Sequence, residues 1–319
     1  MFVVLSGGVG AARFLRGVTS AVDPQDVTAI VNVGDDLDLH GLRICPDLDS
    51  ITYWLAGLVH PEQQWGRADE RFTVRDTLQE LGLETWFTLG DRDLAVHLHR
   101  TALLRTGMPL SRVTADITSR LGLALRLLPV SDDPIETRIH TADGRDLHFQ
   151  QWWVGERADP AISRIEFRGA ATARPAPGVI EAILHADVVV VAPSNPVVSV
   201  TPITSVPAVA DALAATSAPV VGISPIIGGH VVRGMADRLL PAVGVEVEAA
   251  AVAAWYGSRR DGGLLDAWIV DTADAAALDT IRALGLHTLA TNTLLDDLDV
   301  ASDLARQVLD LATQIRTRP

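Results

Sequence analysis

The amino-acid sequence predicts an α/β fold, a Rossmann-like, doubly wound, mostly parallel sheet with a helical and β-hairpin insertion. Apolar, strand-like runs alternate with helical patterns near both ends of the 319-residue chain, which is the rhythm of β–α–β units. Glycines directly follow the first apolar run, as they do where such units bind nucleotides. We expect a single domain, 1–319, with a Rossmann-like core of residues 1–49 and 171–319 and an insertion at about 50–170.

The first fifty residues predict one β–α–β unit. Residues 2–6 are apolar, residues 10–22 have helical spacing, and residues 27–33 (VTAIVNV) form a second apolar run. The acidic segment that follows, VNVGDDLDLHGLRICPDLDS at residues 31–50, is expected to be a loop at the end of the second strand.

The insertion is expected to begin with helices and to continue with short strands. Apolar residues recur at i, i+3 and i+4 in residues 51–59, 71–81, 93–105 and 110–122. Strand character follows in residues 124–131, 137–142, 146–154 and 164–169. The break ADGRD between two of these runs predicts a hairpin.

The α/β alternation returns after the insertion. Strands are expected at residues 187–193, 219–225, 264–271 and 286–292. Helices are expected at residues 177–186, 208–216, 231–244, 272–285 and 302–315. In such a sheet the ligand site lies beyond the carboxyl ends of the strands.

The composition is that of a globular protein with an acidic surface. A net charge of −14 disfavours nucleic acid as a partner, because a polyphosphate backbone calls for a basic face. The single cysteine, Cys45, excludes an intramolecular disulfide and fits a reducing compartment. We see neither a signal peptide nor an apolar run that could span a bilayer. We therefore expect a cytoplasmic protein with no membrane partner.

All 26 basic residues are arginine, and the chain has no lysine. Lysine-dependent phosphate loops and Schiff bases are therefore excluded. Any phosphate must be held by backbone amides, helix N-termini, arginine or a metal ion.

Five aspartates crowd the acidic segment: Asp35, Asp36, Asp38, Asp47 and Asp49. Carboxylates packed this closely repel one another, and a cation relieves the repulsion. We expect a Mg²⁺ site that handles phosphates. The alternative for any one of them is a solvated turn or a helix cap.

The glycine segment after the first strand contains Gly7, Gly8, Val9 and Gly10. Glycines let the backbone approach a phosphate, and the following helix N-terminus supplies amide donors. The segment lacks a full dinucleotide-binding pattern, so a mononucleotide is the expected ligand. Packing between strand and helix is the alternative.

Two later strands also end in polar loops. Ser194 and Asn195 follow the strand at 187–193, and Ser224 and Gly228 follow the strand at 219–225. Their side chains and amides are candidates for reading a base or ribose, although proline and glycine there also serve as turn residues.

Arg92 and the pair Trp152 and Trp153 are further candidates. Arg92 precedes a helix and is expected to hold an anionic substrate group, or else to be an exposed residue near a helix cap. The tryptophans are candidates for stacking on a flat ring, and we expect at least one of them to pack in the core instead.

Ten motifs occur in the order of a known family: SGGVGAARFL, VNVGDD, HGLRICPDLD, WGRADE, LGDRDLA, LLPVSDD, HFQQWWV, APSNPVVS, SPIIGG and RGMAD. From Ser6 to about Gly257 the chain thus resembles the 2-phospho-L-lactate transferase family of coenzyme F420 biosynthesis. It is most similar to the bacterial members, whose donor carries enolpyruvate.

The resemblance implies a magnesium-dependent phosphotransferase for substituted phosphate groups. A phosphoenolpyruvyl or 2-phospho-L-lactyl group would pass from a GDP-linked donor to the terminal ribityl hydroxyl of the deazaflavin 7,8-didemethyl-8-hydroxy-5-deazariboflavin. GMP would leave, and dehydro coenzyme F420-0 or its saturated form would result. The resemblance also implies a homodimer.

Carried over by motif, the site residues fall into four groups. The metal ligands would be Asp47 with Asp35 or Asp36. Asp47, Asp49 and Arg92 are the catalytic candidates, and Arg92 as a clamp on the diphosphate or carboxylate is our own addition. The donor would be lined by Gly7, Gly8, Val9, Gly10, Ser194, Asn195, Ser224 and Gly228. The deazaflavin would contact Asp49, Trp152 and Trp153.

A non-enzymatic regulator that binds a sugar nucleotide is the competing interpretation, because a related group shares the glycine and acidic segments. The segment LDLHGLRICPDLD and the motif PSNPVVS favour the transferase. The sequence does not identify the donor acid, which could be enolpyruvate, lactate or glycerate.

Overall fold

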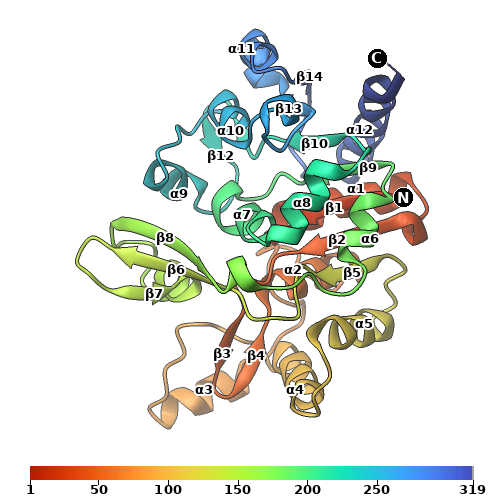
Figure 1. The fold of residues 1–319 in the computed structure, drawn as a ribbon. Coiled ribbons are helices and arrows are strands. Elements are labelled where there is room, and N and C mark those ends of the chain that lie inside the picture. The colour runs from red at the N-terminus through yellow and green to blue at the C-terminus, as the bar shows by residue number, and fades with distance from the viewer. Residues whose placement is uncertain (318–319) are drawn as a thin grey trace.

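The computed structural model describes residues 1–317, which fold around a seven-stranded, entirely parallel sheet (Figure 1). In spatial order its strands are β14 (His287–Thr291), β13 (Ala267–Asp271), β10 (Val220–Ile223), β9 (Val188–Val191), β1 (Phe2–Ser6), β2 (Val27–Val31) and β5 (Arg126–Pro129). Most of these strands are buried along their whole length, which explains their continuous runs of valine, isoleucine and leucine. The predicted doubly wound α/β class is confirmed.

The chain reverses its direction of progress across the sheet at β1. From β1 it moves through β2 to β5 on one side, and then returns to β9, β10, β13 and β14 on the other. The carboxyl ends of β1 and β9 therefore flank the topological switch point, where open α/β sheets bind their ligands.

Helices cover both faces of the sheet. Helix α1 (Gly8–Ala21) buries Ala11, Phe14, Leu15 and Val18, which share one face at helical spacing. This helix packs against α2 (Pro46–Leu55) and α12 (Leu298–Thr317). The other core helices are α6 (Val179–Leu184), α7 (Thr201–Thr204), α8 (Pro207–Ala215), α9 (Ala236–Ala242), α10 (Ala249–Tyr256) and α11 (Leu278–Ala283).

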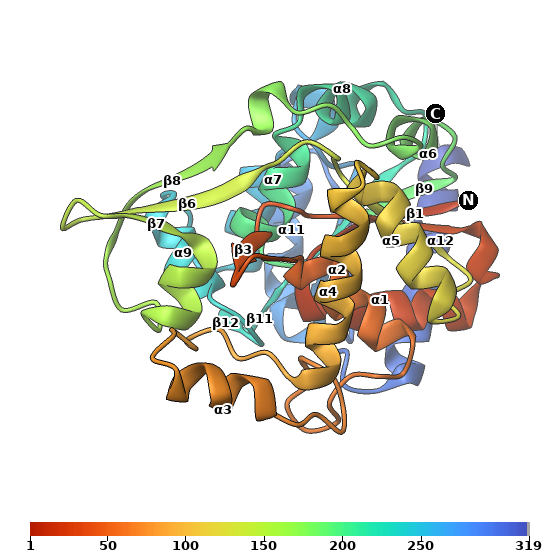
Figure 2. The ribbon, with the colours of Figure 1, turned by 90° about the horizontal axis from the view of Figure 1, so that it is seen from below.

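The insertion consists of a helical part and an antiparallel sheet (Figures 1 and 2). Its helices are α3 (Thr73–Glu80), α4 (Asp91–Arg105) and α5 (Leu110–Arg120). Its sheet has the order β7 (Asp146–His148), β6 (Glu136–Thr141) and β8 (Ile162–Arg168), so the hairpin at ADGRD is confirmed. In both views this sheet projects from the core beside α9.

Several sequence expectations need correction. The strand expected at 124–131 is β5, which pairs with β2 in the core sheet and not with the insertion strands. Residues 151–155 form a π-helical turn instead of continuing the strand that ends at His148. The helix expected over 231–244 covers only Ala236–Ala242, and β11 (Ile226–Ile227) pairs with β12 (His230–Val231) before it. Helix α10 was not predicted.

The acidic segment is not a simple loop. Its middle forms an antiparallel hairpin, β3 (Leu37–Leu39) and β4 (Leu42–Ile44), and its end is the first turn of α2. Asp47 and Asp49 therefore lie on a helix, whose N-terminal amides favour negative charge there. Only Asp38 of the five aspartates is highly exposed, with its side chain on the hairpin.

No single helix among residues 1–317 is both long and apolar enough to cross a membrane. One sharply bent pair, Pro196–Thr204 with Pro207–Ala215, meets the length and composition criteria only when its two helices are taken together.

Candidate functional site

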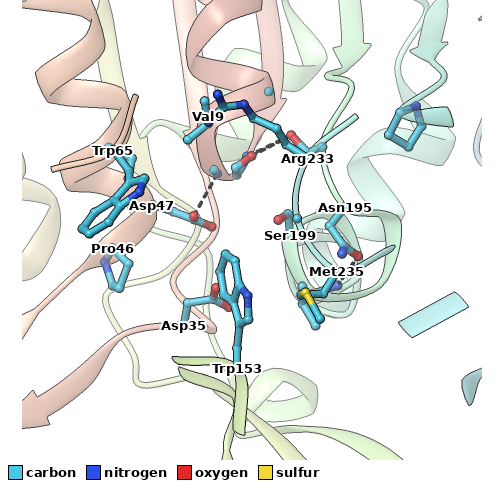
Figure 3. A pocket seen from close by; sticks show the side chains of 18 of the residues that line it. Val9, Asp35, Pro46, Asp47, Trp65, Trp153, Asn195, Ser199, Arg233 and Met235 are labelled. Carbon is cyan, nitrogen blue, oxygen red and sulfur yellow. Dashed lines mark hydrogen bonds between the residues drawn. The ribbon is translucent and has the colours of Figure 1, made fainter. Parts of the chain in front are cut away.

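A cavity of about 540 Å³ opens at the topological switch point (Figure 3). This volume suits a nucleotide-sized ligand. The core sheet supplies one wall, from the segments after β1, β9 and β10, and the insertion supplies another. Of the candidates predicted from sequence, the cavity is lined by Gly7, Gly8, Val9, Gly10, Asp35, Asp47, Asp49, Trp153, Ser194, Asn195 and Ser224.

Two candidates lie outside this cavity because of their packing. Trp152 is fully buried and its indole Nε1 donates to the carbonyl of Pro160, so it has no free face for a ligand. Trp152 is therefore the tryptophan of the pair that packs in the core. Arg92 is exposed, and its guanidinium approaches Asp69 at 3.8 Å. The expected clamp role of Arg92 does not fit this position.

Asp36 and Gly228 also lie outside the main cavity. Asp36 faces a second hollow, and its Oδ2 lies 3.5 Å from the guanidinium of Arg43. Burial outweighs this attraction and raises the pKa of Asp36 to about 7. The amide of Gly228 donates to Asp274 at 2.9 Å and is thus already satisfied.

The glycine segment forms the first turn of α1. The amide of Gly8 donates to Asp47 Oδ1 at 2.8 Å, and the hydroxyl of Ser194 donates to the carbonyl of Gly7 at 2.7 Å. The first bond joins α1 to α2, and the second joins it to the loop after β9. The three strand-end segments are thereby held as one unit.

Gly10 is required for close packing at this junction. A Cβ atom at Gly10 would collide with the carbonyl oxygen of Pro193. We expect Gly10→Ala to lower the free energy of unfolding by about 2 kcal/mol, because the backbone would have to move. Denaturant unfolding measures this loss. Ser20→Ala, on an exposed part of the same helix, should leave the stability unchanged, and an equal effect of both changes would contradict the packing account.

Asp35 and Asp47 form a buried carboxylate pair that shares one amide. Asn32 Nδ2 lies 3.2 Å from Asp35 Oδ1 and 2.8 Å from Asp47 Oδ2, and Gln150 Nε2 donates to Asp35 Oδ2 at 3.1 Å. The two side chains are only 3% and 6% exposed. Within residues 1–317, neither has a cationic side chain within ion-pair distance.

Burial raises the pKa of both carboxyls. For Asp35 burial comes first and the charge of Asp47 second, and together they raise its pKa well above the ordinary value. Burial raises the pKa of Asp47 to about 6, although the bonds from Asn32 and Gly8 oppose it. Two desolvated carboxylates that face a cavity without a counter-ion are a donor set suited to a divalent cation.

Asp49 is compensated in a different way. Arg100 is buried beside it and donates to both of its carboxylate oxygens. Arg100 Nη1 also lies 3.0 Å from His97 Nδ1, and because a guanidinium can only donate, this ring nitrogen is placed to accept. Burial by itself would lower the pKa of Arg100. The negative charges around it, that of Asp49 first, have the larger combined effect, and the pKa of Arg100 rises.

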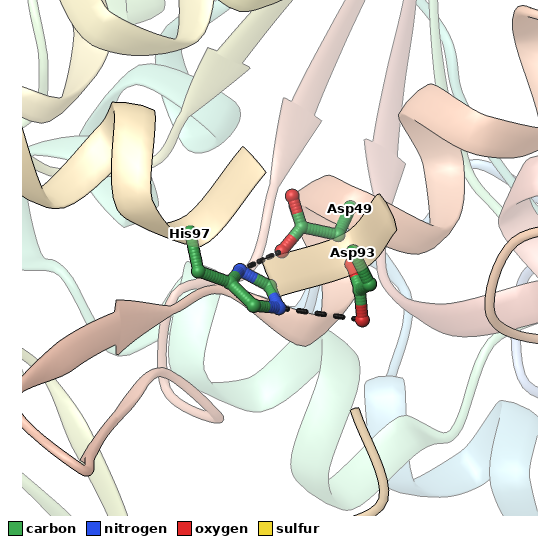
Figure 4. Close-up of side chains that lie close together, drawn as sticks. All are labelled: Asp49, Asp93 and His97. Atoms are coloured by element: carbon green, nitrogen blue, oxygen red, sulfur yellow. Dashed lines mark ion pairs between the residues drawn. The ribbon is translucent and has the colours of Figure 1, made fainter. Parts of the chain in front are cut away.

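Asp49, Asp93 and His97 form a cluster at the cavity wall (Figure 4). His97 lies between the two carboxylates, with Nδ1 3.6 Å from Asp49 and Nε2 3.3 Å from Asp93. Tyr53 donates its hydroxyl to Asp93. The geometry could accommodate a metal ion, but Arg100 already neutralises Asp49, so the pair Asp35 and Asp47 is the better metal site.

Sequence reasoning missed several cavity residues. Asp93 and His97 are four positions apart on an expected helix, and this spacing could have indicated one face. Gln150 carries no such signal, because its contact with Asp35 spans 115 positions. Asn32 lies behind the cavity, where it donates to Asp47. Trp65, Arg13 and Arg233 also line the cavity. They lie in the family motifs WGRADE, SGGVGAARFL and RGMAD, but the motifs alone did not assign these side chains a role.

The chain is similar to known proteins over nearly its full length. Residues 2–307 match the family model of the 2-phospho-L-lactate transferase CofD. A phosphoenolpyruvate transferase of Streptomyces griseus is 49% identical over 98% of this chain and 99% of its own length. One of Kitasatospora aureofaciens is 50% identical, with 98% of each chain covered.

Similarity to solved structures is weaker and concerns the fold alone. A Bacillus halodurans protein of the upf0052 family superposes with a TM-score of 0.65 at 20% identity, over 97% of this chain and 98% of that chain.

Proposed function

Because the chain belongs to the 2-phospho-L-lactate transferase CofD family and is a transferase of coenzyme F420 biosynthesis, we propose that it moves a phosphoenolpyruvyl group. The donor would be enolpyruvyl-2-diphospho-5'-guanosine, and the acceptor the terminal ribityl hydroxyl of the deazaflavin. The hydroxyl oxygen bonds to the phosphorus nearer the enolpyruvyl group. The bond from this phosphorus to the bridging oxygen breaks, GMP leaves with that oxygen and the electron pair, and the hydroxyl proton passes to solvent. The names of the bacterial relatives favour enolpyruvate over lactate.

The observation that carries this proposal is the pair Asp35 and Asp47 opposite the glycine segment. Phosphoryl transfer depends on positioning and charge neutralisation more than on covalent catalysis. A Mg²⁺ ion, when bound, would supply charge neutralisation for the diphosphate. Asp35 and Asp47 would hold it, and Asn32 and Gln150 would fix the orientation of their carboxylates.

The core wall of the cavity would hold the donor. The helix N-terminus would offer the amides of Val9 and Gly10 to phosphate, since those of Gly7 and Gly8 already donate to Ser194 and Asp47. Ser194, Asn195 and Ser224 line the same wall. Asn195 Oδ1 already accepts from the amides of Val197 and Val198, so its amide nitrogen is the group left for a ligand.

The insertion wall would hold the deazaflavin. It presents apolar side chains to the cavity, namely Trp65, Phe87, Phe149, Trp153 and Val154. A flat tricyclic ring gains from such contacts. Arg100 fixes the orientation of Asp49. The carboxylate of Asp49 would use its remaining lone pairs to accept a hydrogen bond from a hydroxyl group of the deazaflavin.

We expect Trp153→Ala to weaken deazaflavin binding about tenfold, or ~1.4 kcal/mol, because a stacking face is lost. The deazaflavin is fluorescent, so a direct titration measures its Kd. Trp255 is equally exposed, 36%, but lies outside the cavity, and Trp255→Ala is the matched control. Equal affinities of the Trp153 variant and the wild type would remove this residue from the acceptor site.

A non-enzymatic regulator that binds a sugar nucleotide is the competing function. Calorimetry separates the two. The transferase should bind GDP and the deazaflavin, whereas the regulator should bind a UDP-sugar and no deazaflavin. Binding of the UDP-sugar alone would contradict the transferase proposal.

We further propose a cytoplasmic homodimer. The lone buried cysteine fits a reducing compartment, and the family resemblance implies the dimer. Light scattering across a range of concentrations tests the assembly, with a monomer at all concentrations as the contradicting result.

A further inference from the structure

Two guanidinium groups, those of Arg13 and Arg233, line the nucleotide-sized cavity, and no other arginine among residues 1–317 does. Arg13 lies on α1, one turn beyond the glycine segment. Arg233 lies in the loop between β12 and α9, and Figure 3 shows it near Val9 of the glycine segment. In a chain without lysine, these are the two permanent cations of the site.

Arg13 is buried and only partly neutralised. Its Nη1 donates to Asp296 at 2.7 Å, and its guanidinium lies over the ring of Trp54 at 5.6 Å. The Asp296 side chain is 62% exposed, so water and salt screen much of this ion pair. The Nε of Arg13 is buried and has no hydrogen-bond partner.

Arg233 has no carboxylate within ion-pair distance in the described part of the chain. Its Nη1 donates to the carbonyl of Gln63 at 3.4 Å, in the insertion segment between α2 and α3. Burial, followed by the charge of Arg233, lowers the pKa of Arg13. The two like charges thus repel each other beside a cavity, an arrangement that an anion bound between them would stabilise.

We propose that Arg233, together with Arg13, holds the diphosphate of the guanosine-linked donor. This inference rests on the transferase function proposed above and assigns to Arg233 the role first expected of Arg92. The fit is electrostatic. Asp35 and Asp47 face the cavity as the anionic wall for a divalent cation, while Arg13 and Arg233 form a cationic wall beside the glycine amides. A diphosphate between these walls would contact the divalent cation on one side and the two guanidinium groups on the other.

The experiment measures GDP and deazaflavin binding separately by calorimetry, in the presence of Mg²⁺. For Arg233→Ala we expect at least a tenfold increase in the Kd for GDP, an unchanged Kd for the deazaflavin, and a weaker dependence of GDP binding on salt. Arg233→Lys should recover part of the affinity, because it restores the charge without the planar fork.

Arg260→Ala is the matched control, since Arg260 is an exposed arginine outside the cavity, in the short 3-10 helix Arg259–Asp261. Its GDP affinity should equal that of the wild type. A GDP affinity of Arg233→Ala within twofold of the wild type, or an equal loss for the deazaflavin, would overturn the assignment. A wild-type protein that binds no GDP would instead overturn the transferase proposal on which the assignment rests.

Discussion

We expect Asp47→Asn to abolish transfer, with kcat lower by roughly a thousandfold or more, and to make the ligand-free protein more stable. Activity falls because an amide is a poor ligand for Mg²⁺ and cannot neutralise its charge. The change loses one of the two hydrogen bonds that Asp47 accepts, about 1 kcal/mol, because asparagine has a single acceptor oxygen. Stability should still rise, because the change removes one charge from a buried pair that lacks a cationic partner. A purely structural residue at this position would lose activity and stability together.

The stability gain depends on pH in a defined direction. The pKa of Asp47 is raised to about 6, so the folded state binds its proton more tightly than the unfolded state does. The resulting penalty for the wild type is absent below pH 4, grows as the pH rises towards 6, and is complete above it. The gain from Asp47→Asn should therefore be about 1 kcal/mol or more at pH 8 and should shrink towards pH 4.

Thermal unfolding without Mg²⁺ at pH 8 and pH 5 measures this difference. Asp38→Asn is the control, because the Asp38 side chain is highly exposed and lies outside the main cavity. It should change neither stability nor turnover. Wild-type turnover in Asp47→Asn at saturating Mg²⁺ would contradict the metal assignment.

We expect Arg100→Met to lower the free energy of unfolding by about 3–5 kcal/mol, because it leaves a buried carboxylate without its partner. Arg100 donates to both oxygens of Asp49, and both residues are buried. Burial of Asp49 is then uncompensated, and Asp93 also loses a nearby positive charge.

Two further variants isolate the ion pair in denaturant unfolding. Arg105→Met, on the last turn of the same helix, should cost little, because Arg105 is exposed and bonds only the carbonyl of Gly41. Adding Asp49→Asn to Arg100→Met should restore part of the stability, since the unpaired charge disappears. No recovery in the double variant would show that packing, and not charge, explains the loss.

The sequence alone predicted which backbone segments meet. Gly7 and Ser194 are 187 positions apart, yet both follow apolar strands, and strand ends in a parallel sheet share one edge. The acidic segment also follows an apolar strand, and the family motifs indicated that its aspartates belong to the same site. Local sequence patterns and the expected topology together were sufficient to predict that Gly8, Asp47 and Ser194 lie at one site.

Side-chain direction was not predictable from these patterns. Trp152 and Trp153 are neighbours in a turn, so one faces the core and the other the cavity, and composition does not tell them apart. Likewise Asp35 and Asp36 face different hollows, and only Asp36 has an arginine partner. These differences depend on which elements pack around each residue.

Long-range partners also escaped prediction. The strand β5 was assigned to the insertion because its neighbours in sequence are insertion strands, but its partner is β2. Arg92 was chosen because it precedes an expected helix in a chain without lysine. Arg233 was not considered, and its loop meets Gln63 from 170 positions away.

Mass spectrometry of the product tests the central claim most directly. The protein is incubated with Mg²⁺, the deazaflavin and, in separate reactions, the enolpyruvyl, lactyl and glyceryl diphosphoguanosine donors. The proposal predicts GMP and dehydro coenzyme F420-0 from the enolpyruvyl donor, at a higher rate than product from the other two. Absence of a phosphodiester product of the deazaflavin with all three donors would contradict it.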